Sequence, residues 1–228
     1  GTPPLCTASA WGTDSDTDDE YLLDVDGFLT PSTLAIGTIG AGPAVVLKRQ
    51  PAFFDGAGLA VQQHFAVSDD GTRIPYFVVA PDSAVPPGGW PTVLHGYGGF
   101  EISLQPGYGG ARGRAWLARG GCYVVANIRG GGEYGPRWHS ATLKRHRHLV
   151  YEDFAAVAGD LVTRGLTTPP RRPRSPTVRS NSSKNETMRD PTTSPEQAEK
   201  VFHRLLRAPL AAPAAAVRAH VQEVRSAR

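Results

Sequence analysis

The sequence lacks long apolar runs and is poor in cysteine and methionine. No stretch approaches the roughly 18 apolar residues of a transmembrane helix, and no basic, apolar leader opens the chain. Its two cysteines, Cys6 and Cys122, are too few for a disulfide framework and favour a reducing compartment. We expect Cys122 to be buried within an apolar run and Cys6 to lie in a segment with little order. With 40% hydrophobic and 20% charged residues, the 228-residue chain is typical of a globular protein of one or two domains.

The basic excess of the chain is confined to its C-terminal part. The formal net charge is +3, to which residues 1–168 contribute −4 and residues 169–228 contribute +7. The basic tail has no basic-aromatic pattern, so we expect no nucleic-acid binding. The pair His146 and His148 stands among Lys144, Arg145 and Arg147, whose positive charges oppose a divalent ion. We therefore predict neither a metal nor a cofactor.

Two short apolar runs, each followed directly by a glycine cluster, organise the sequence. Thr92–Leu94 leads into Gly96-Tyr97-Gly98-Gly99, and Cys122–Ile128 leads into Gly130-Gly131-Gly132. Short runs rich in β-branched residues and bounded by glycine predict buried strands. Glycine at a strand exit allows a sharp turn or a close approach of the backbone to another group.

The segment between these runs predicts a helix. Arg114–Arg119 carries helix-forming residues, and Gly120 and Gly121 supply a stop. The order strand, glycine loop, helix, strand, glycine loop is typical of an α/β fold with a parallel sheet. Ligands of such folds bind at the carboxyl ends of the strands. Binding of a nucleotide by the triple glycine is not expected, since Glu133-Tyr134 follows it in place of the Lys-Ser/Thr of a phosphate loop.

A β-hairpin is predicted upstream of these runs. Val61–Val67 and Ile74–Val79 form the arms, and Asp69-Asp70-Gly71 supplies the Asp-Gly turn signal. Pro75 favours an edge position for the second arm, because proline cannot donate to the ladder.

A helix is predicted over residues 149–164. Apolar residues recur there at spacings of three and four, at Val150, Phe154, Val157 and Leu161. We place Glu152 and Asp153 in its first turn, where the helix dipole favours negative charge. Gly165 ends the helix.

Residues 1–58 give weaker signals. Asp14–Glu20 holds five acids and predicts a solvated loop. The short apolar runs Tyr21–Leu23, Leu34–Ile36 and Val45–Leu47 are compatible with strands of an all-β region. A partly disordered N-terminal extension is the alternative.

Three blocks of this sequence resemble the prolyl oligopeptidase family of serine peptidases. They are Gly96-Tyr97-Gly98-Gly99-Phe100, Trp116–Gly121, and Ala126–Gly135 with Trp138-His139. The resemblance extends from about Asp55 to about Pro169. It implies a partial α/β-hydrolase sheet, with an antiparallel hairpin and then parallel strands with helices, over residues 59–168. It also implies that residues 1–58 are a β-propeller remnant and linker.

The resemblance also implies roles for individual residues. Tyr97 matches the tyrosine whose hydroxyl donates to the oxyanion, and Phe100 matches a phenylalanine that lines the pocket for proline. Judged by spacing alone, Tyr97 is a loop aromatic that packs on the sheet. For Phe100, packing in the core is the alternative to a role in the pocket. We interpret Arg129 and Glu133 as a structural ion pair. The activity implied is hydrolysis of short peptides after proline, in the cytoplasm, with no metal, nucleic acid or membrane involved.

The catalytic triad of the family is absent from these 228 residues. No Gly-x-Ser-x-Gly occurs, and residues 169–200 contain only three apolar residues, Val178, Met188 and Ala198. None of the seven histidines occupies a position that matches the catalytic histidine. We expect residues 169–228 to be a low-complexity, disordered basic tail with a short helix near residues 195–208.

Two functional hypotheses follow. In the first, a prolyl oligopeptidase-like enzyme is truncated or frameshifted before its nucleophile, so that the chain is inactive as given. In the second, a non-catalytic interaction protein retains half a hydrolase domain and binds partners through its basic tail. The sequence does not indicate the oligomeric state.

Overall fold

The computed structural model describes residues 3–14, 16–169 and 217–221, the last segment as backbone. The strands are β1 (Cys6–Gly12), β2 (Glu20–Gly27), β3 (Thr33–Thr38), β4 (Val45–Arg49), β5 (Leu59–Val67), β6 (Arg73–Pro81), β7 (Thr92–Gly96), β8 (Cys122–Ala126) and β9 (Val217–Val221). The helices are α1 (Gly110–Ala115), η1 (Leu117–Arg119), α2 (Pro136–Ser140), η2 (Lys144–His146) and α3 (His148–Thr163).

The described residues divide into two compact units. The first lies within Gly1–Gln63, Phe77–Ser83 and Gln105–Tyr123, and the second within His64–Tyr76, Ala84–Leu104 and Val124–Arg228. This division cuts through β5, β6 and β8 and therefore does not follow the boundaries expected from sequence, which stay a prediction.

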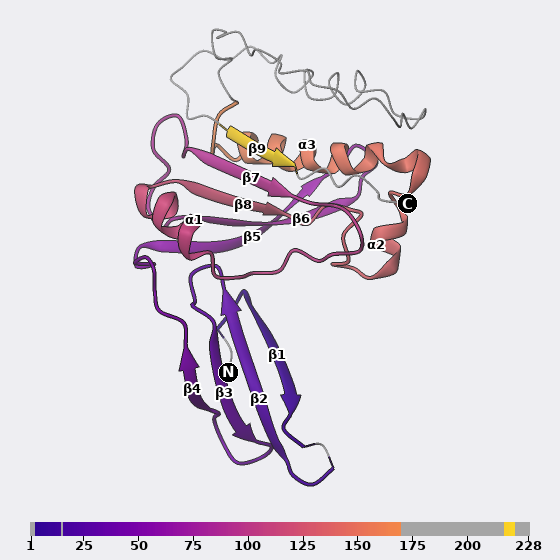
Figure 1. Cartoon of the computed structure of the whole chain (residues 1–228). Helices are drawn as coiled ribbons and strands as arrows, with labels where there is room; N and C mark the ends of the chain where they lie inside the picture. Colours follow the sequence, from indigo (N-terminus) through magenta and orange to yellow (C-terminus); the bar gives the residue numbers. More distant parts are fainter. Residues whose placement is uncertain (1–2, 15, 170–216, 222–228) are drawn as a thin grey trace, which may run out of the picture. The chain divides into compact units, whose positions relative to one another are not determined.

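The first unit contains a four-stranded antiparallel sheet in the order β1-β2-β3-β4 (Figure 1). The three apolar runs predicted as strands are confirmed as β2, β3 and β4. The sequence did not predict β1, and the expectation of little order around Cys6 is wrong. Cys6 opens that strand, and its thiol lies 3.7 Å from the hydroxyl of Thr30. Both cysteines are free thiols.

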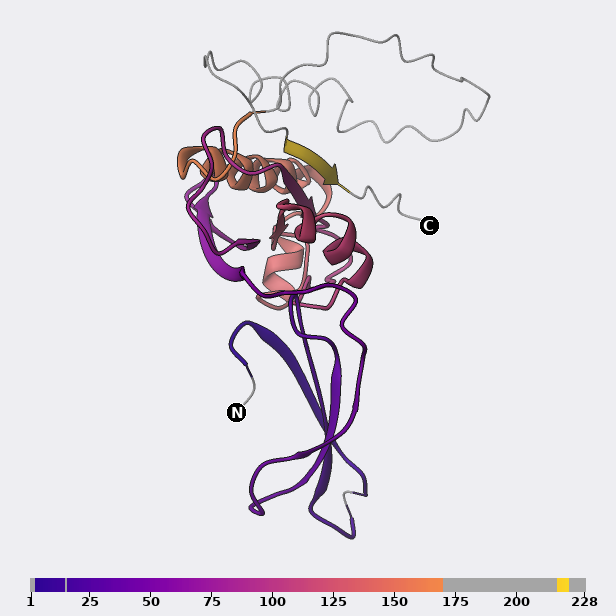
Figure 2. The ribbon, with the colours of Figure 1, turned by 90° about the vertical axis from the view of Figure 1, so that its left-hand side faces the viewer.

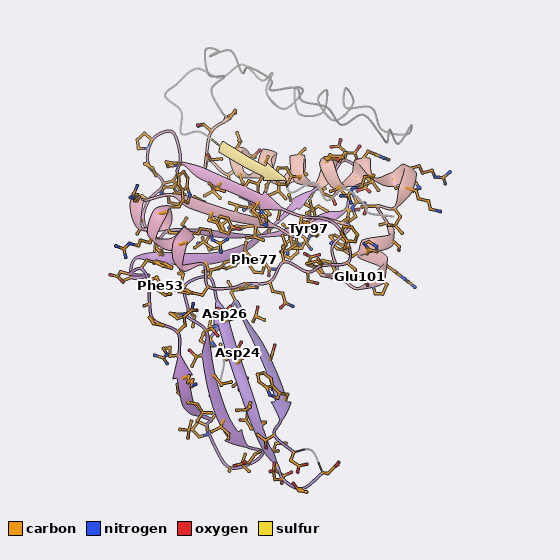
Figure 3. All side chains as sticks on the ribbon, in the orientation of Figure 1. Asp24, Asp26, Phe53, Phe77, Tyr97 and Glu101 are labelled. Carbon is orange, nitrogen blue, oxygen red and sulfur yellow. The ribbon has the colours of Figure 1, made fainter. Side chains whose placement is uncertain are left out.

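Aromatic side chains give the first unit its local packing. The ring of Phe28 is buried, and its centroid lies 5.5 Å from that of Phe77 and 6.5 Å from that of Tyr123. The Tyr108 backbone N–H donates to a carboxylate oxygen of Asp26 at 2.9 Å. Phe77 and Asp26 are labelled in Figure 3.

A second sheet has five strands in the order β5-β6-β8-β7-β9. The predicted hairpin is confirmed as β5 and β6, joined by a turn in which Gly71 has φ +84°. The expected edge position of Pro75 is wrong, because β6 lies between β5 and β8. Proline is tolerated there because it stands near the start of β6. Its carbonyl still accepts the N–H of Asn127, just past the end of β8, at 2.9 Å.

The helix expected over Arg114–Arg119 is interrupted. α1 ends at Ala115, Trp116 leaves helical geometry with φ −126°, and a short 3-10 turn, η1, follows. The Trp116 indole donates to the Cys122 carbonyl at 2.8 Å, a contact that ties this residue to β8. The stop at Gly120 is confirmed, with φ +79°.

The predicted helix over residues 149–164 is confirmed as α3. Its buried side chains are Val150, Asp153, Phe154, Val157 and Leu161. The placement of Glu152 and Asp153 in the first turn is wrong, since the helix begins at His148 and its first turn holds no acid. The phenyl ring of Phe154 lies over Gly96 of β7, where an added Cβ would come within 2.9 Å of it.

The tail contributes an element that the sequence did not predict. β9 runs parallel to β7, with Val217 opposite Thr92 and Val221 opposite Gly96. Figure 1 shows β9 (yellow) beside β7, with both arrows pointing the same way, and Figure 2 shows β9 from the side. The helix expected near residues 195–208 lies outside the described residues.

Candidate functional site

Two glycine loops meet where β7 and β8 end. The first loop follows β7 and holds Gly98, and the second loop follows β8 and holds Gly130. A Cβ added to Gly130 would overlap the carbonyl oxygen of Gly98, and one added to Gly98 would lie 2.8 Å from the carbonyl oxygen of Arg129. Both glycines have positive φ, of +59° at Gly98 and +96° at Gly130. The glycines therefore allow the two loop backbones to approach each other more closely than side chains permit.

The guanidinium of Arg147 and a backbone hydrogen bond hold this contact together. The guanidinium of Arg147, just before α3, donates to the carbonyl oxygen of Gly98 at 2.6 Å. The backbone N–H of Glu101 donates to the carbonyl oxygen of Gly130 at 3.2 Å. The first loop is thus tied to the second loop and to the start of α3.

The first loop contains two consecutive non-glycine residues in the left-handed region. Phe100 has φ +52° and Glu101 has φ +57°. Each such residue costs on the order of 1 kcal/mol, so the contacts of the loop must outweigh the strain. Strain of this kind is found at functional sites more often than elsewhere, and it marks this loop as a candidate site.

The two residues singled out by the resemblance lie in this loop. Tyr97, half-buried, directly follows β7, and Figure 3 labels it together with Glu101. Phe100 is 54% exposed and is therefore not a core residue. The Tyr97 ring packs beside Gly99, whose added Cβ would lie 3.6 Å away. The structure thus brings both candidates to one surface loop.

A buried ion pair anchors the second loop. The Arg129 guanidinium donates to Asp153 of α3, from Nε at 2.9 Å and from Nη2 at 2.6 Å, and its backbone N–H donates to the same carboxylate at 3.0 Å. Asp153 is fully buried and also accepts the hydroxyl proton of Ser68 at 2.7 Å. A buried charge is tolerated when it is paired and hydrogen-bonded in this way.

The same guanidinium reaches the hairpin turn. Arg129 Nη1 pairs with the carboxylate of Asp70, whose side chain is partly exposed. The hydrogen bond from Arg129 lowers the pKa of Asp70 to about 2, and the two carboxylates raise the pKa of Arg129. The expected ion pair between Arg129 and Glu133 is wrong, because Asp153 and Asp70 take both ends of the guanidinium.

Glu133 instead binds neutral donors. Its Oε1 accepts the backbone N–H of Leu104 and the side-chain amide of Asn127, both at 3.0 Å. That amide also donates to the Leu104 carbonyl at 2.7 Å. Glu133 therefore fixes the end of the first loop to the strand exit of β8. Oε2 of this carboxylate is buried, with no hydrogen-bond partner among the described residues.

His139 of α2 supports the strained residues of the first loop. Its Nδ1 lies 2.8 Å from the carbonyl oxygen of Gly130 and 3.2 Å from the backbone nitrogen of Glu101. The sequence motif contained His139 but gave no sign of this position. Within the described residues, no group of three or more His, Cys, Asp or Glu side chains is placed to hold a metal ion.

Comparison with known proteins shows which family the sequence resembles. Residues 111–172 match the model of the prolyl oligopeptidase family. Over 168 residues, 74% of this chain, the sequence is 45% identical to an uncharacterised peptidase, y4nA, of Sinorhizobium fredii (strain NBRC 101917 / NGR234), of which it covers 23%.

This chain belongs to the prolyl oligopeptidase family.

Other members of the prolyl oligopeptidase family are similar to this chain in sequence and in structure. A prolyl endopeptidase of Elizabethkingia miricola is 36% identical over 73% of the chain and 23% of the relative. A solved post-proline cleaving enzyme from Rickettsia typhi superposes with a TM-score of 0.62 at 30% identity, over 72% of this chain and 23% of that one. The chain thus spans about a quarter of the length of the relatives that it matches.

None of the helices in the described part of the chain has the length and hydropathy needed to cross a bilayer.

Proposed function

We propose that this chain is part of a serine endopeptidase that hydrolyses short peptides after proline in the cytoplasm. The observation that supports the proposal most is the strained, exposed loop that carries Tyr97 and Phe100 and is fixed by the triple-glycine loop. Side chains that position a substrate need a rigid support, because they lose their effect on the reaction when they move.

In this proposal the chain supplies one donor and one apolar wall. Hydrolysis by a serine passes through a tetrahedral oxyanion, which donors aimed at the developing charge stabilise. The hydroxyl of Tyr97 is the proposed donor. The exposed phenyl ring of Phe100 is the proposed wall for a proline ring, which is rigid and apolar.

The chain as printed lacks the attacking group, so we propose that it does not hydrolyse peptides by itself. Incubation with a fluorogenic peptide that contains proline is expected to give no turnover above buffer. A fluorophosphonate, which labels activated serines, is expected to label nothing. Labelling of any serine in the chain would contradict this part of the proposal.

The hypothesis of a frameshift can be tested on the coding DNA. If the reading frame shifts after codon 169, one of the other two frames is expected to encode an apolar strand that ends in Gly-x-Ser-x-Gly. Absence of that pattern from both frames would exclude a frameshift and make the tail native.

A restored enzyme would then test the role of Tyr97. Tyr97→Phe removes one donor to the oxyanion and is expected to lower kcat by about 10²- to 10³-fold. Tyr134→Phe is the matched control, because it removes the hydroxyl of an exposed tyrosine in the neighbouring loop. Equal activity of the Tyr97→Phe variant and the unmodified enzyme would remove Tyr97 from the mechanism.

The second candidate is a non-catalytic interaction protein that retains half a hydrolase domain. One observation favours it: β9 pairs with the outer edge of β7, so the tail of this chain contributes a strand to the partial sheet. The edge that remains is the five-residue β9, and short edge strands limit aggregation. A cooperative thermal transition of the purified chain supports this candidate, and aggregation without a transition opposes it.

A further inference from the structure

The outer edge of β7 needs a partner strand. Thr92 and Leu94 are fully buried, as is expected of an internal strand, and β8 pairs with only one side of β7. Along a strand, the backbone N–H and C=O groups point alternately to the two sides, so half of those in β7 face away from β8. Such a row of backbone groups at a sheet edge pairs readily with another strand.

The partner comes from the distant tail. All five residues of β9 lie opposite the five residues of β7 in a parallel register, from Val217 opposite Thr92 to Val221 opposite Gly96. Residues 170–216 separate β9 from the rest of the sheet in sequence. β9 is therefore distant from β7 in sequence, and residues 170–216, called the tether below, link it to the rest of the sheet.

We propose that the outer edge of β7 is a docking strip for a parallel strand, with β9 of the same chain as its detachable occupant. Two properties make the occupant detachable. β9 has only five residues, and parallel pairing is slightly weaker per residue than antiparallel pairing. The inference does not depend on peptidase activity.

The tether keeps the strip occupied. Because β9 is covalently linked to the rest of the chain, its effective concentration at the strip can reach the millimolar range, and this concentration falls as the linking segment lengthens. A free peptide at micromolar concentration therefore cannot compete with β9 in the intact chain. Once β9 is disabled, the same peptide is expected to bind to the strip.

A double proline substitution disables β9 without touching β7. N–H groups of adjacent residues point to opposite sides of a strand, so Arg218→Pro with Ala219→Pro removes one N–H that faces β7 whichever way the register alternates. Ala214→Pro with Ala215→Pro places the same two prolines before β9 and serves as the matched control.

The probe is a fluorescein-labelled peptide that spans residues 215–223, and its binding is followed by fluorescence anisotropy. It is expected to bind to the Arg218→Pro/Ala219→Pro chain at least tenfold more tightly than to the unmodified chain or the control. A second peptide, which carries Arg218→Pro with Ala219→Pro, is expected to bind to none of the three. Equal binding to all three chains would overturn the proposal, as would no binding to any of them.

Hydrogen exchange tests the same proposal in the unmodified chain. The β7 amides are expected to be protected to the same extent at low and high protein concentration, in a particle of monomer mass. Exchange of the outward β7 amides as fast as that of exposed β4 amides would overturn the proposal. A dimer whose β7 protection disappears on dilution would also overturn it, because the occupant would then be the β9 of a second copy. This measurement decides the question even if the double proline variant does not fold.

Discussion

The sheet of β1 to β4 and the segment that holds β8 and α3 differ in how their charges and apolar groups are used. In the first sheet, all five residues of β4 are exposed, and large apolar side chains such as Trp11 and Val46 face solvent. In the second, every residue of β8 is buried, and α3 buries a carboxylate that pairs with Arg129.

This difference predicts where the chain is vulnerable. A sheet with few buried side chains tolerates substitution but adds little to cooperative stability. A buried ion pair is costly to break, because the partner left behind is a charge with no counter-charge. Substitutions of similar size should therefore have very different effects in the two regions.

The largest expected effect comes from breaking the buried pair. Asp153→Ala leaves the buried Arg129 guanidinium without its main acceptor and should lower the free energy of unfolding by about 3–5 kcal/mol. Urea unfolding followed by circular dichroism measures the loss. Glu152→Ala, one position earlier in α3, is the control and should change stability by less than about 0.5 kcal/mol. If both variants unfold at the same urea concentration, Arg129 has no special need for Asp153.

A smaller effect is expected where the two glycine loops touch. Gly130→Ala forces a Cβ against the Gly98 carbonyl and places alanine at φ +96°, which should cost about 2–3 kcal/mol. The control is Gly159→Ala in α3, where an added Cβ meets nothing within 4 Å. Because alanine favours a helix, this change should stabilise the chain by about 0.5–1 kcal/mol. Thermal unfolding should therefore separate the two variants in opposite directions, and destabilisation by both would contradict the close contact.

The Asp70 carboxylate should give a still smaller, pH-dependent effect. Its pKa is lowered to about 2 in the folded chain by the hydrogen bond from Arg129. Because the folded pKa lies below the unfolded value of about 3.9, the stabilisation is fully present above about pH 4. It is lost as the pH falls towards 2. The effect stays below about 1 kcal/mol, since Asp70 is partly exposed.

Asp70→Asn should remove this contribution. Urea midpoints at pH 5 and pH 3 measure it, and the unmodified chain should lose more stability between the two pH values than the variant does. The same loss in both chains would show that Asp70 gains nothing from Arg129.

The smallest effect is expected in the exposed sheet. Val46→Lys replaces a half-exposed side chain of β4 and should alter stability by less than about 0.5 kcal/mol. It should also reduce association, because lysine on an exposed strand discourages pairing with other chains. Unfolding and solubility of the purified variant measure the two effects. A loss as large as that of Asp153→Ala would abolish the distinction between the regions.

Local patterns predicted the elements that local forces determine. The Asp-Gly turn predicted the β5–β6 hairpin, and the spacing of Val150, Phe154 and Leu161 predicted α3. The apolar runs before the glycine clusters predicted β7 and β8. In each of these cases a few neighbouring residues carry the signal.

The features that the sequence did not reveal depend on distant partners. The acceptors of Arg129 are Asp153 and Asp70, which stand 24 and 59 residues away. Pro75 stands inside the sheet because β6 lies between β5 and β8, a strand order that no local pattern indicates. β9 is a strand because it pairs with β7 and not because of its composition.

For the candidate site, the sequence indicated the two glycine loops and the residues Tyr97 and Phe100. It did not indicate that the loops fix each other, nor that His139 and Glu133 support them. The roles of Tyr97 and Phe100 in catalysis stay a prediction.

The contact between Gly98 and Gly130 also constrains how this protein can vary. Neither backbone can accept a side chain unless the other one withdraws, so the two positions are not free to change independently. A homologue that carries a larger residue at one of them must therefore have a different backbone conformation in the whole opposing loop. Substitutions at the two positions are then expected to be correlated among homologues.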